Sequence, residues 1–170
     1  MKRLENERAL VTGGSRGIGA AICRRLAFQG AHVALTYVSK PDEAEETVKE
    51  LQTKGVEALA IQADSADAGA VIDAVERTAR ELGGIDMLVN NAAIAVISPI
   101  DDYRLEDLDR MLTVNVRAVF VATQAAVKHM QAGGRIINVG SCNAEQGCRA
   151  MSVLEESRLR TCNPGPRKQI

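Results

Sequence analysis

The fold is decided by the stretch Thr12-Gly13-Gly14-Ser15-Arg16-Gly17-Ile18-Gly19, which joins a short apolar run at 9–11 to a helical pattern at 17–29. In such a strand-to-helix turn, Gly13 permits a tight exit, Gly17 lets the backbone approach a pyrophosphate, and Gly19 allows close packing of helix and strand. The helix N-terminus offers free N–H groups and partial positive charge to an anion. The turn therefore indicates a phosphate-binding loop, and a plain structural turn is the alternative.

Outward from this turn, strand and helix patterns alternate along the chain. Further apolar runs begin at 33–35 and occupy 56–61, 87–89 and 135–139. Helical patterns open at Pro41, follow a predicted cap at Asp67, and cover 105–131. Alternating elements of this kind predict an α/β fold with a doubly wound, Rossmann-type parallel sheet. We expect five strands in the order 3-2-1-4-5, with a ligand crevice at their carboxyl ends.

The pattern at 105–131 differs from the other helices because residues 111–127 are apolar nearly all round. Such a helix must be buried on two sides. The sheet supplies one side, and the other requires a neighbouring helix from this chain or from a second subunit. We therefore expect a homo-oligomer that associates through this helix.

Composition narrows the class of protein. The 170 residues are 46% hydrophobic and 2% aromatic with no tryptophan, which suits a core of Val, Ile, Leu and Ala. The net charge is −1 without a long run of one sign, so neither nucleic acid nor an anionic membrane is expected as partner. The first eight residues are too charged for a signal peptide, and no apolar run reaches the roughly 20 residues of a membrane span. We expect a cytoplasmic location.

Cysteine spacing gives no sign of a metal or redox centre. Cys23, Cys142, Cys148 and Cys162 form no C-x-x-C pair and have no histidine at metal spacing. Reduced thiols without a metal site are the expectation, with a zinc or redox site as the alternative.

Three further features fall where the crevice is expected. The sequence Asn90-Asn91-Ala92-Ala93 ends the fourth strand, Asn115 lies inside the most apolar helix, and Ser141 follows the fifth strand. Each has a plain alternative: asparagines that tie strand ends together, a satisfied core amide, and an ordinary turn serine.

Together these motifs resemble the short-chain dehydrogenase/reductase family, which carries T-G-x-x-x-G-x-G, N-N-A-G, a mid-helix Asn and a strand-terminal Ser in this order. The resemblance covers about residues 5–141 and is strongest to 3-oxoacyl-(acyl carrier protein) reductases and related carbonyl reductases. Ala93 departs from the last glycine of N-N-A-G. The resemblance implies a nicotinamide cofactor, a small carbonyl substrate, catalytic roles for Asn115 and Ser141, and an adenine contact at Asp64, for which a helix N-cap role is the alternative.

The type of nicotinamide cofactor follows from the end of the second strand. An NAD site places a carboxylate there, whereas residues 36–40 contain none. Arg16 and Lys40 instead suit the 2′-phosphate of NADP, with ordinary surface cations as the alternative. The predicted cofactor-binding residues are Gly13, Ser15, Arg16, Gly17, Ile18, Gly19, Tyr37, Ser39, Lys40, Asp64, Asn91 and Ala92.

The family's Tyr-x-x-x-Lys pair is missing at its expected spacing after Ser141, where Leu154 and Arg158 stand. The polar residues 155–160 and an early Pro-Gly turn suggest a shortened, frame-shifted or deleted C-terminus, so that 1–141 form the NADP-binding domain and 142–170 an irregular tail. We therefore predict an NADP-dependent reductase with impaired catalysis. The alternatives are a non-catalytic NADP-binding module and an inactive truncated gene product.

Overall fold

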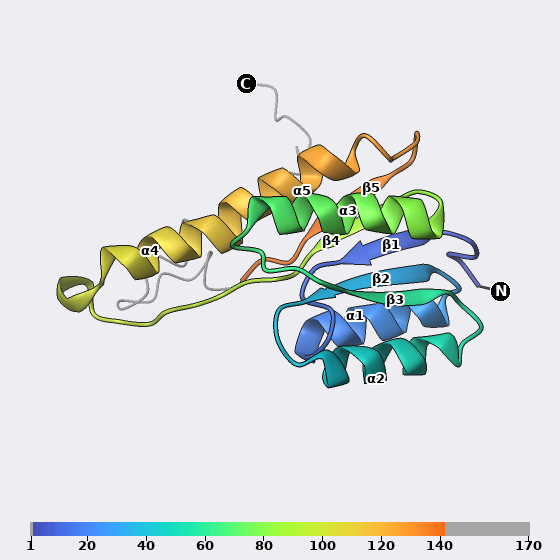
Figure 1. The fold of residues 1–170 in the computed structure, drawn as a ribbon, viewed down its shortest axis with the longest axis horizontal. Coiled ribbons are helices and arrows are strands. Elements are labelled where there is room, and N and C mark those ends of the chain that lie inside the picture. The colour runs from blue at the N-terminus through green and yellow to red at the C-terminus, as the bar shows by residue number, and fades with distance from the viewer. Residues whose placement is uncertain (1, 142–170) are drawn as a thin grey trace, which may run out of the picture.

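Five parallel strands form the sheet in the computed structural model, which describes residues 2–141 (Figure 1). The strands are β1 (Arg8–Val11), β2 (His32–Tyr37), β3 (Ala58–Gln62), β4 (Met87–Asn90) and β5 (Arg135–Asn138). Their order, β3-β2-β1-β4-β5, confirms the predicted doubly wound sheet. β3 begins two residues later than predicted, because the Glu57 N–H donates to the side-chain Nδ1 of His32 in β2, at 2.9 Å, and not to a backbone carbonyl.

Helices cover both faces of the sheet and explain why its strands are apolar on both sides. α1 (Gly17–Phe28) and α2 (Pro41–Gln52) lie on one face, and α3 (Ala68–Leu82) and α5 (Ala118–Ala126) on the other (Figure 1). In β1, Leu10 packs in the core beneath α3 and α5, whereas its neighbour Val11 packs in the core beneath α1 and α2. Alternate side chains of one strand thus serve two cores.

The start of α3 follows from local side-chain chemistry. Oδ1 of Asp67 accepts hydrogen bonds from the N–H groups of Gly69 (2.8 Å) and Ala70 (3.2 Å). These are N–H groups that the first turn of a helix leaves without a backbone partner. The predicted cap is confirmed.

The predicted helix at 105–131 is a continuous helical run in three parts. α4 (Leu105–Leu112) leads into a π-helical turn, η2 (Thr113–Arg117), and then into α5. The run ends at Ala126 and not at residue 131, because the N–H groups of Lys128 and His129 turn back to carbonyls only three residues earlier. α4 projects past the carboxyl ends of the strands (Figure 1).

Within residues 2–141 this helical run packs on the sheet and, through α5, on the neighbouring helix α3, and its outer side stays uncovered. Its small and medium apolar residues are buried against the core, as Val114, Ala118 and Ala122 illustrate. On the outer side, Leu112, Phe120 and Val127 are 41%, 62% and 50% exposed. The predicted neighbouring helix is thus α3 of this chain for part of the run, and no segment of residues 2–141 covers the outer stripe.

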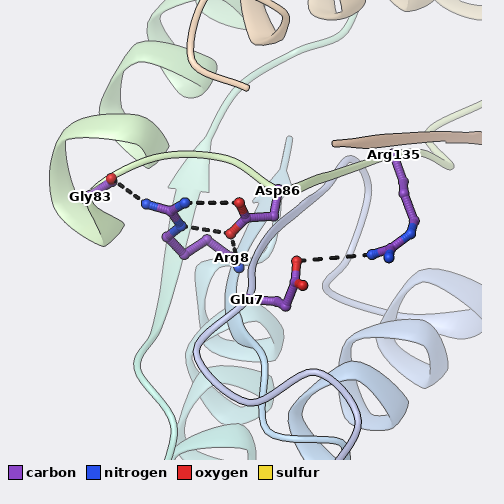
Figure 2. Close-up of polar contacts among 5 residues, drawn as sticks. All are labelled: Glu7, Arg8, Gly83, Asp86 and Arg135. Atoms are coloured by element: carbon purple, nitrogen blue, oxygen red, sulfur yellow. Dashed lines mark hydrogen bonds and ion pairs between the residues drawn. The ribbon is translucent and has the colours of Figure 1, made fainter. Parts of the chain in front are cut away.

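At the amino ends of the strands, an ion pair joins Arg8 of β1 to Asp86, the residue before β4 (Figure 2). Nε and Nη2 of Arg8 donate to the two carboxylate oxygens of Asp86 at 2.7 and 2.8 Å, and Nη1 donates to the Gly83 carbonyl. The Arg8 N–H also donates to Asp86, at 2.9 Å. Glu7 and Arg135 pair more loosely beside them, at 4.0 Å. The hydrogen bond from Arg8 lowers the pKa of the Asp86 carboxyl below its usual value of 3.8.

None of the helices in the described part of the chain combines the length and apolar character needed to cross a membrane. Among the same residues, histidine, cysteine and acidic side chains nowhere gather in a group that could hold a metal ion.

Candidate functional site

The glycine-rich turn presents the N-terminus of α1 at the carboxyl end of β1. Arg16 occupies the N-cap position, no side chain caps this end, and the first turn contains no acidic residue. Gly17 has φ +54, and no heavy atom lies within 4 Å of the place a Cβ would take. The first N–H groups of the helix, which lack intrahelical partners, are thus available to an anion.

Close packing explains the glycine at position 19. A Cβ there would overlap the Gly13 carbonyl oxygen and lie 2.6 Å from Nδ2 of Asn91. That amide nitrogen donates to the carbonyls of Thr12 (2.9 Å) and Gly13 (3.1 Å). Asn91 therefore ties β4 to the glycine turn, as the plain alternative for this motif predicts.

Thr12 opens the glycine turn and is its structural centre, a role that the motif alone did not predict. Its Oγ1 accepts hydrogen bonds from the N–H groups of Asn91 and Ala92, both at 3.0 Å. The side chain is buried between β1 and β4. A threonine that ends an apolar strand just before the glycines was the available signal.

A cavity of about 470 Å³ opens beside the turn, within the size range of small-molecule sites. It is lined by eleven of the twelve predicted cofactor-binding residues: Gly13, Ser15, Arg16, Gly17, Ile18, Gly19, Tyr37, Ser39, Asp64, Asn91 and Ala92. The structure thus brings together residues from four segments that are distant in sequence. We call this cavity the cleft.

Lys40 is the predicted residue that does not line the cleft. It lies at the N-cap of α2 with φ 67, and its Nζ is 2.5 Å from Oε1 of Glu43 in the first turn of that helix. An acidic residue at a helix N-terminus is itself favoured there, and it holds the lysine. Of the two predicted cations, only Arg16 faces the cleft.

The cleft also has lining residues that the sequence did not reveal: Thr36, Val38, Ala63, Ser65, Ala93, Ile94, Arg110 and Val114. Thr36 has a defined structural role, because its Oγ1 accepts from the Gly13 N–H at 3.0 Å. Its place at the end of an apolar strand was a usable signal. Arg110 belongs to no motif, and only the position of α4 beyond the carboxyl ends of the strands brings it here.

Asp64 lies in the cleft and not at a helix end. Its Oδ1 accepts from the Ala66 N–H at 2.9 Å, which shapes the turn after β3, whereas Asp67 caps α3. The N-cap alternative for Asp64 is therefore wrong. The second carboxylate oxygen has no protein partner within residues 2–141.

Asn115 is buried in the π-helical turn and binds an irregular segment of backbone. Its Oδ1 accepts from the Ile94 N–H at 3.0 Å, and its Nδ2 donates to the Ile94 carbonyl at 2.9 Å. The satisfied-amide alternative describes this side chain well, and it leaves the catalytic prediction untested.

A small hollow of about 30 Å³ lies beside Asn115. It is also lined by Gly140, the residue before Ser141. Leu154 and Arg158 lie outside the described residues.

A second asparagine pair closes the same hollow from the sheet. Nδ2 of Asn90 donates to Oδ1 of Asn138 at 2.8 Å, across the carboxyl ends of β4 and β5. Both side chains line the hollow with Asn115. Asn90 thus ties strand ends together, and its neighbour Asn91 lines the cleft.

Cys23 lies directly beneath the glycine turn. Burial raises the pKa of its thiol to about 12, and its Sγ is 3.8 Å from the Gly14 carbonyl oxygen. A buried thiol of this kind is a packing residue with little thiolate at neutral pH. The other three cysteines lie outside the described residues.

The donors in the cleft fit a dinucleotide phosphate. The uncapped α1 N-terminus and the open space at Gly17 suit a pyrophosphate. The Arg16 side chain makes no ion pair within residues 2–141 and lines the same cleft as the hydroxyl-bearing residues Tyr37 and Ser39.

Comparison with known proteins shows which family shares this sequence and fold. The sequence profile described as short chain dehydrogenase matches residues 7–155. A short chain dehydrogenase from Burkholderia cenocepacia, solved in complex with NADP, is 52% identical with a TM-score of 0.90, over 92% of this chain and 64% of that one.

Two curated relatives agree with this structural likeness. An uncharacterized oxidoreductase of Methylorubrum extorquens is 41% identical over 83% of this chain and 57% of its own length. Versicolorin reductase 1 of Aspergillus parasiticus is 39% identical over 84% and 54%. The chain thus spans little more than half the length of these two relatives. It belongs to the short-chain dehydrogenase family.

Proposed function

We propose that this chain binds NADP as the cofactor-binding part of an NADP-dependent oxidoreductase. The observation that carries the proposal is the position of Arg16, a cation without an ion-pair partner in residues 2–141, at a cleft whose β2 side offers no carboxylate. The similar protein from Burkholderia cenocepacia was solved with NADP.

Each part of the cleft has a task in this proposal. The α1 N-terminus holds the pyrophosphate, and Arg16 and Ser39 hold the 2′-phosphate, which carries about −1.5 to −2 charge. Asn91 and Ala92 form the wall beneath the adenosine ribose, and Asp64 accepts from the adenine. When bound, the cofactor supplies a hydride.

Titration with both reduced cofactors tests the proposal. The nicotinamide fluorescence of NADPH and NADH is followed as the full chain is added at low ionic strength. We expect NADPH to bind at least tenfold more tightly, because one charge-assisted contact contributes about 1.5–3 kcal/mol. Equal affinities, or no binding of NADPH, would refute it.

We further propose a carbonyl substrate of the 3-oxoacyl type with impaired turnover. The substrate class rests on the motif resemblance, and versicolorin reductase 1 is itself named as a reductase. Leu154 and Arg158 stand where the family's Tyr and Lys are expected. Loss of a positioned general acid lowers the rate by about 10²–10⁴-fold.

NADPH consumption with an acetoacetyl thioester, measured beside an intact family member, tests this second step. Turnover within tenfold of the control would contradict the impaired-catalysis proposal. NADPH binding with no turnover of any carbonyl would favour the second candidate, a non-catalytic NADP-binding module.

The exposed side of the long helical run supports a homo-oligomer. Leu105, Leu112, Phe120 and Val127 recur every seven or eight residues and are all exposed. This spacing places them in one stripe, which a second copy of the chain would cover.

Light scattering at micromolar concentration should find a dimer or larger species. A monomer for the unchanged chain would refute the proposal, and Phe120→Gln should shift the equilibrium toward monomer.

A further inference from the structure

Arg110 brings a second cation to the cleft, from the wall opposite the glycine turn. It lies in the last turn of α4, the helix that projects past the carboxyl ends of the strands (Figure 1). Its side chain lines the cleft together with Val114, one helical turn further along the same face.

No contact within residues 2–141 gives Arg110 a structural role. Arg110 makes no side-chain hydrogen bond or ion pair there, and Glu106, one turn earlier, pairs with Arg104 at 3.4 Å. A cation in the last turn of a helix ordinarily stabilises its free carbonyl end. Here α4 continues into η2 and α5, so no free end is present.

The neighbours of Arg110 show which end of the cleft it faces. Val114 lines a small hollow together with Ser65, the second residue after the Ala63 that follows β3. Ser65 and Asp64 also line the cleft, so the α4 wall adjoins the end of β3. In the proposed function, Asp64 marks the adenine end of the cofactor. Arg110 therefore lies at that end.

We propose that Arg110 is a cofactor-binding residue whose guanidinium stacks on the adenine base, closing the cleft from α4. The inference rests on the proposed NADP binding. A guanidinium is planar and weakly hydrated, so it stacks on aromatic faces, whereas the ammonium of lysine has no such plane. Arg16 holds the phosphate on one side of the adenosine, and Arg110 covers the base on the other.

The experiment compares Arg110→Gln and Arg110→Lys with a matched control, Arg117→Gln. Arg117 is also exposed, lies on the same helical run and does not line the cleft. Binding of NADPH, adenosine 2′,5′-bisphosphate and nicotinamide mononucleotide is measured by titration, with circular dichroism as a check of folding. We expect Arg110→Gln to weaken NADPH and the bisphosphate about 5- to 30-fold, and Arg110→Lys to recover little of this. The mononucleotide and the Arg117 control should change less than twofold.

Each other outcome overturns the inference in a recognisable way. Unchanged NADPH affinity in Arg110→Gln, with the unchanged chain binding normally, removes the stacking role and leaves the proposed function intact. Full recovery by lysine assigns the contact to charge on a phosphate, not to the base. Equal weakening of the mononucleotide assigns the effect to a general disturbance of α4. If the unchanged chain binds no NADPH, the proposed function fails as well.

Discussion

The two ends of the sheet use arginine in opposite ways. At the amino ends of the strands, Arg8 is held by both oxygens of Asp86 and by a backbone carbonyl (Figure 2). At the carboxyl ends, Arg16 and Arg110 line the cleft and find no side-chain partner within residues 2–141. An arginine held by a carboxylate and a backbone carbonyl stabilises the fold, whereas one without a side-chain partner beside an uncapped helix is available to an anionic ligand.

This contrast makes the two ends separable by mutation. Changes at the carboxyl end should alter cofactor binding, and changes at the amino end should alter stability alone. The predictions below run from the largest expected effect to the smallest.

Gly19→Ala should abolish NADPH binding, with at least 100-fold loss of affinity, and destabilise the chain by about 1–3 kcal/mol. The added Cβ would overlap a backbone oxygen of the turn that presents the α1 N-terminus. Titration and thermal unfolding measure the two effects. The control is Gly55→Ala, which has φ +77 and open space around it, so it should cost about 1 kcal/mol without changing NADPH affinity. Normal binding by Gly19→Ala would contradict the packing argument.

Arg16→Glu should weaken NADPH by about 10- to 100-fold and leave NADH nearly unchanged, because only NADP carries the 2′-phosphate. The difference should shrink as salt is raised, since the contact is partly exposed to solvent. Arg80→Glu, an exposed arginine of α3, is the control and should affect both cofactors equally. Equal losses for NADPH and NADH in Arg16→Glu would place this residue on the pyrophosphate instead.

Asp86→Asn should lower the free energy of unfolding by about 2 kcal/mol at pH 7, because it removes a charge-assisted pair that holds β1 to β4. The folded-state pKa of Asp86 lies below its unfolded value of 3.8. Its stabilisation is therefore complete well above pH 4 and is lost as the pH falls through the folded pKa.

Denaturant unfolding at several pH values follows this prediction. The difference between the unchanged chain and Asp86→Asn should shrink as the pH falls below 4, and the affinity for NADPH at pH 7 should be unaffected. Asp73→Asn, an exposed acid on α3, is the matched control and should show no such pH dependence. A pH-independent difference would mean that loss of the charge is not the cause.

Most of the sheet and most of the cleft followed from the sequence because their signals are local. Strands, helices and the glycine turn each carry their own periodicity or spacing, and parallel topology then brings their ends together. Lys40 does not line the cleft, and its acidic neighbour Glu43 holds it, so its cofactor contact stays a prediction. Arg110 was missed because its position depends on how α4 extends past the sheet, which no local pattern encodes.

The irregular segment at 91–99 depends on side chains from the long helical run for its position. Besides the two Asn115 bonds to Ile94, Oη of Tyr103 donates to the Val96 carbonyl at 3.1 Å and lies 2.8 Å from Sδ of Met111. The Val96 N–H also reaches that sulfur, at 3.4 Å. Met111 is fully buried, so α4 fixes the position of the sulfur that both groups contact.

Tyr103→Phe should therefore produce the smallest of these effects. One hydroxyl is lost while the Asn115 contacts remain, so we expect about 1 kcal/mol of lost stability and a two- to fivefold weaker affinity for NADPH, since Ile94 lines the cleft. Thermal unfolding and fluorescence titration measure these changes. Met111→Leu removes the sulfur acceptor and keeps the volume, so a double-mutant cycle isolates the coupling. Strictly additive effects of the two substitutions would show that Tyr103 and Met111 do not act together to hold the segment over the cleft.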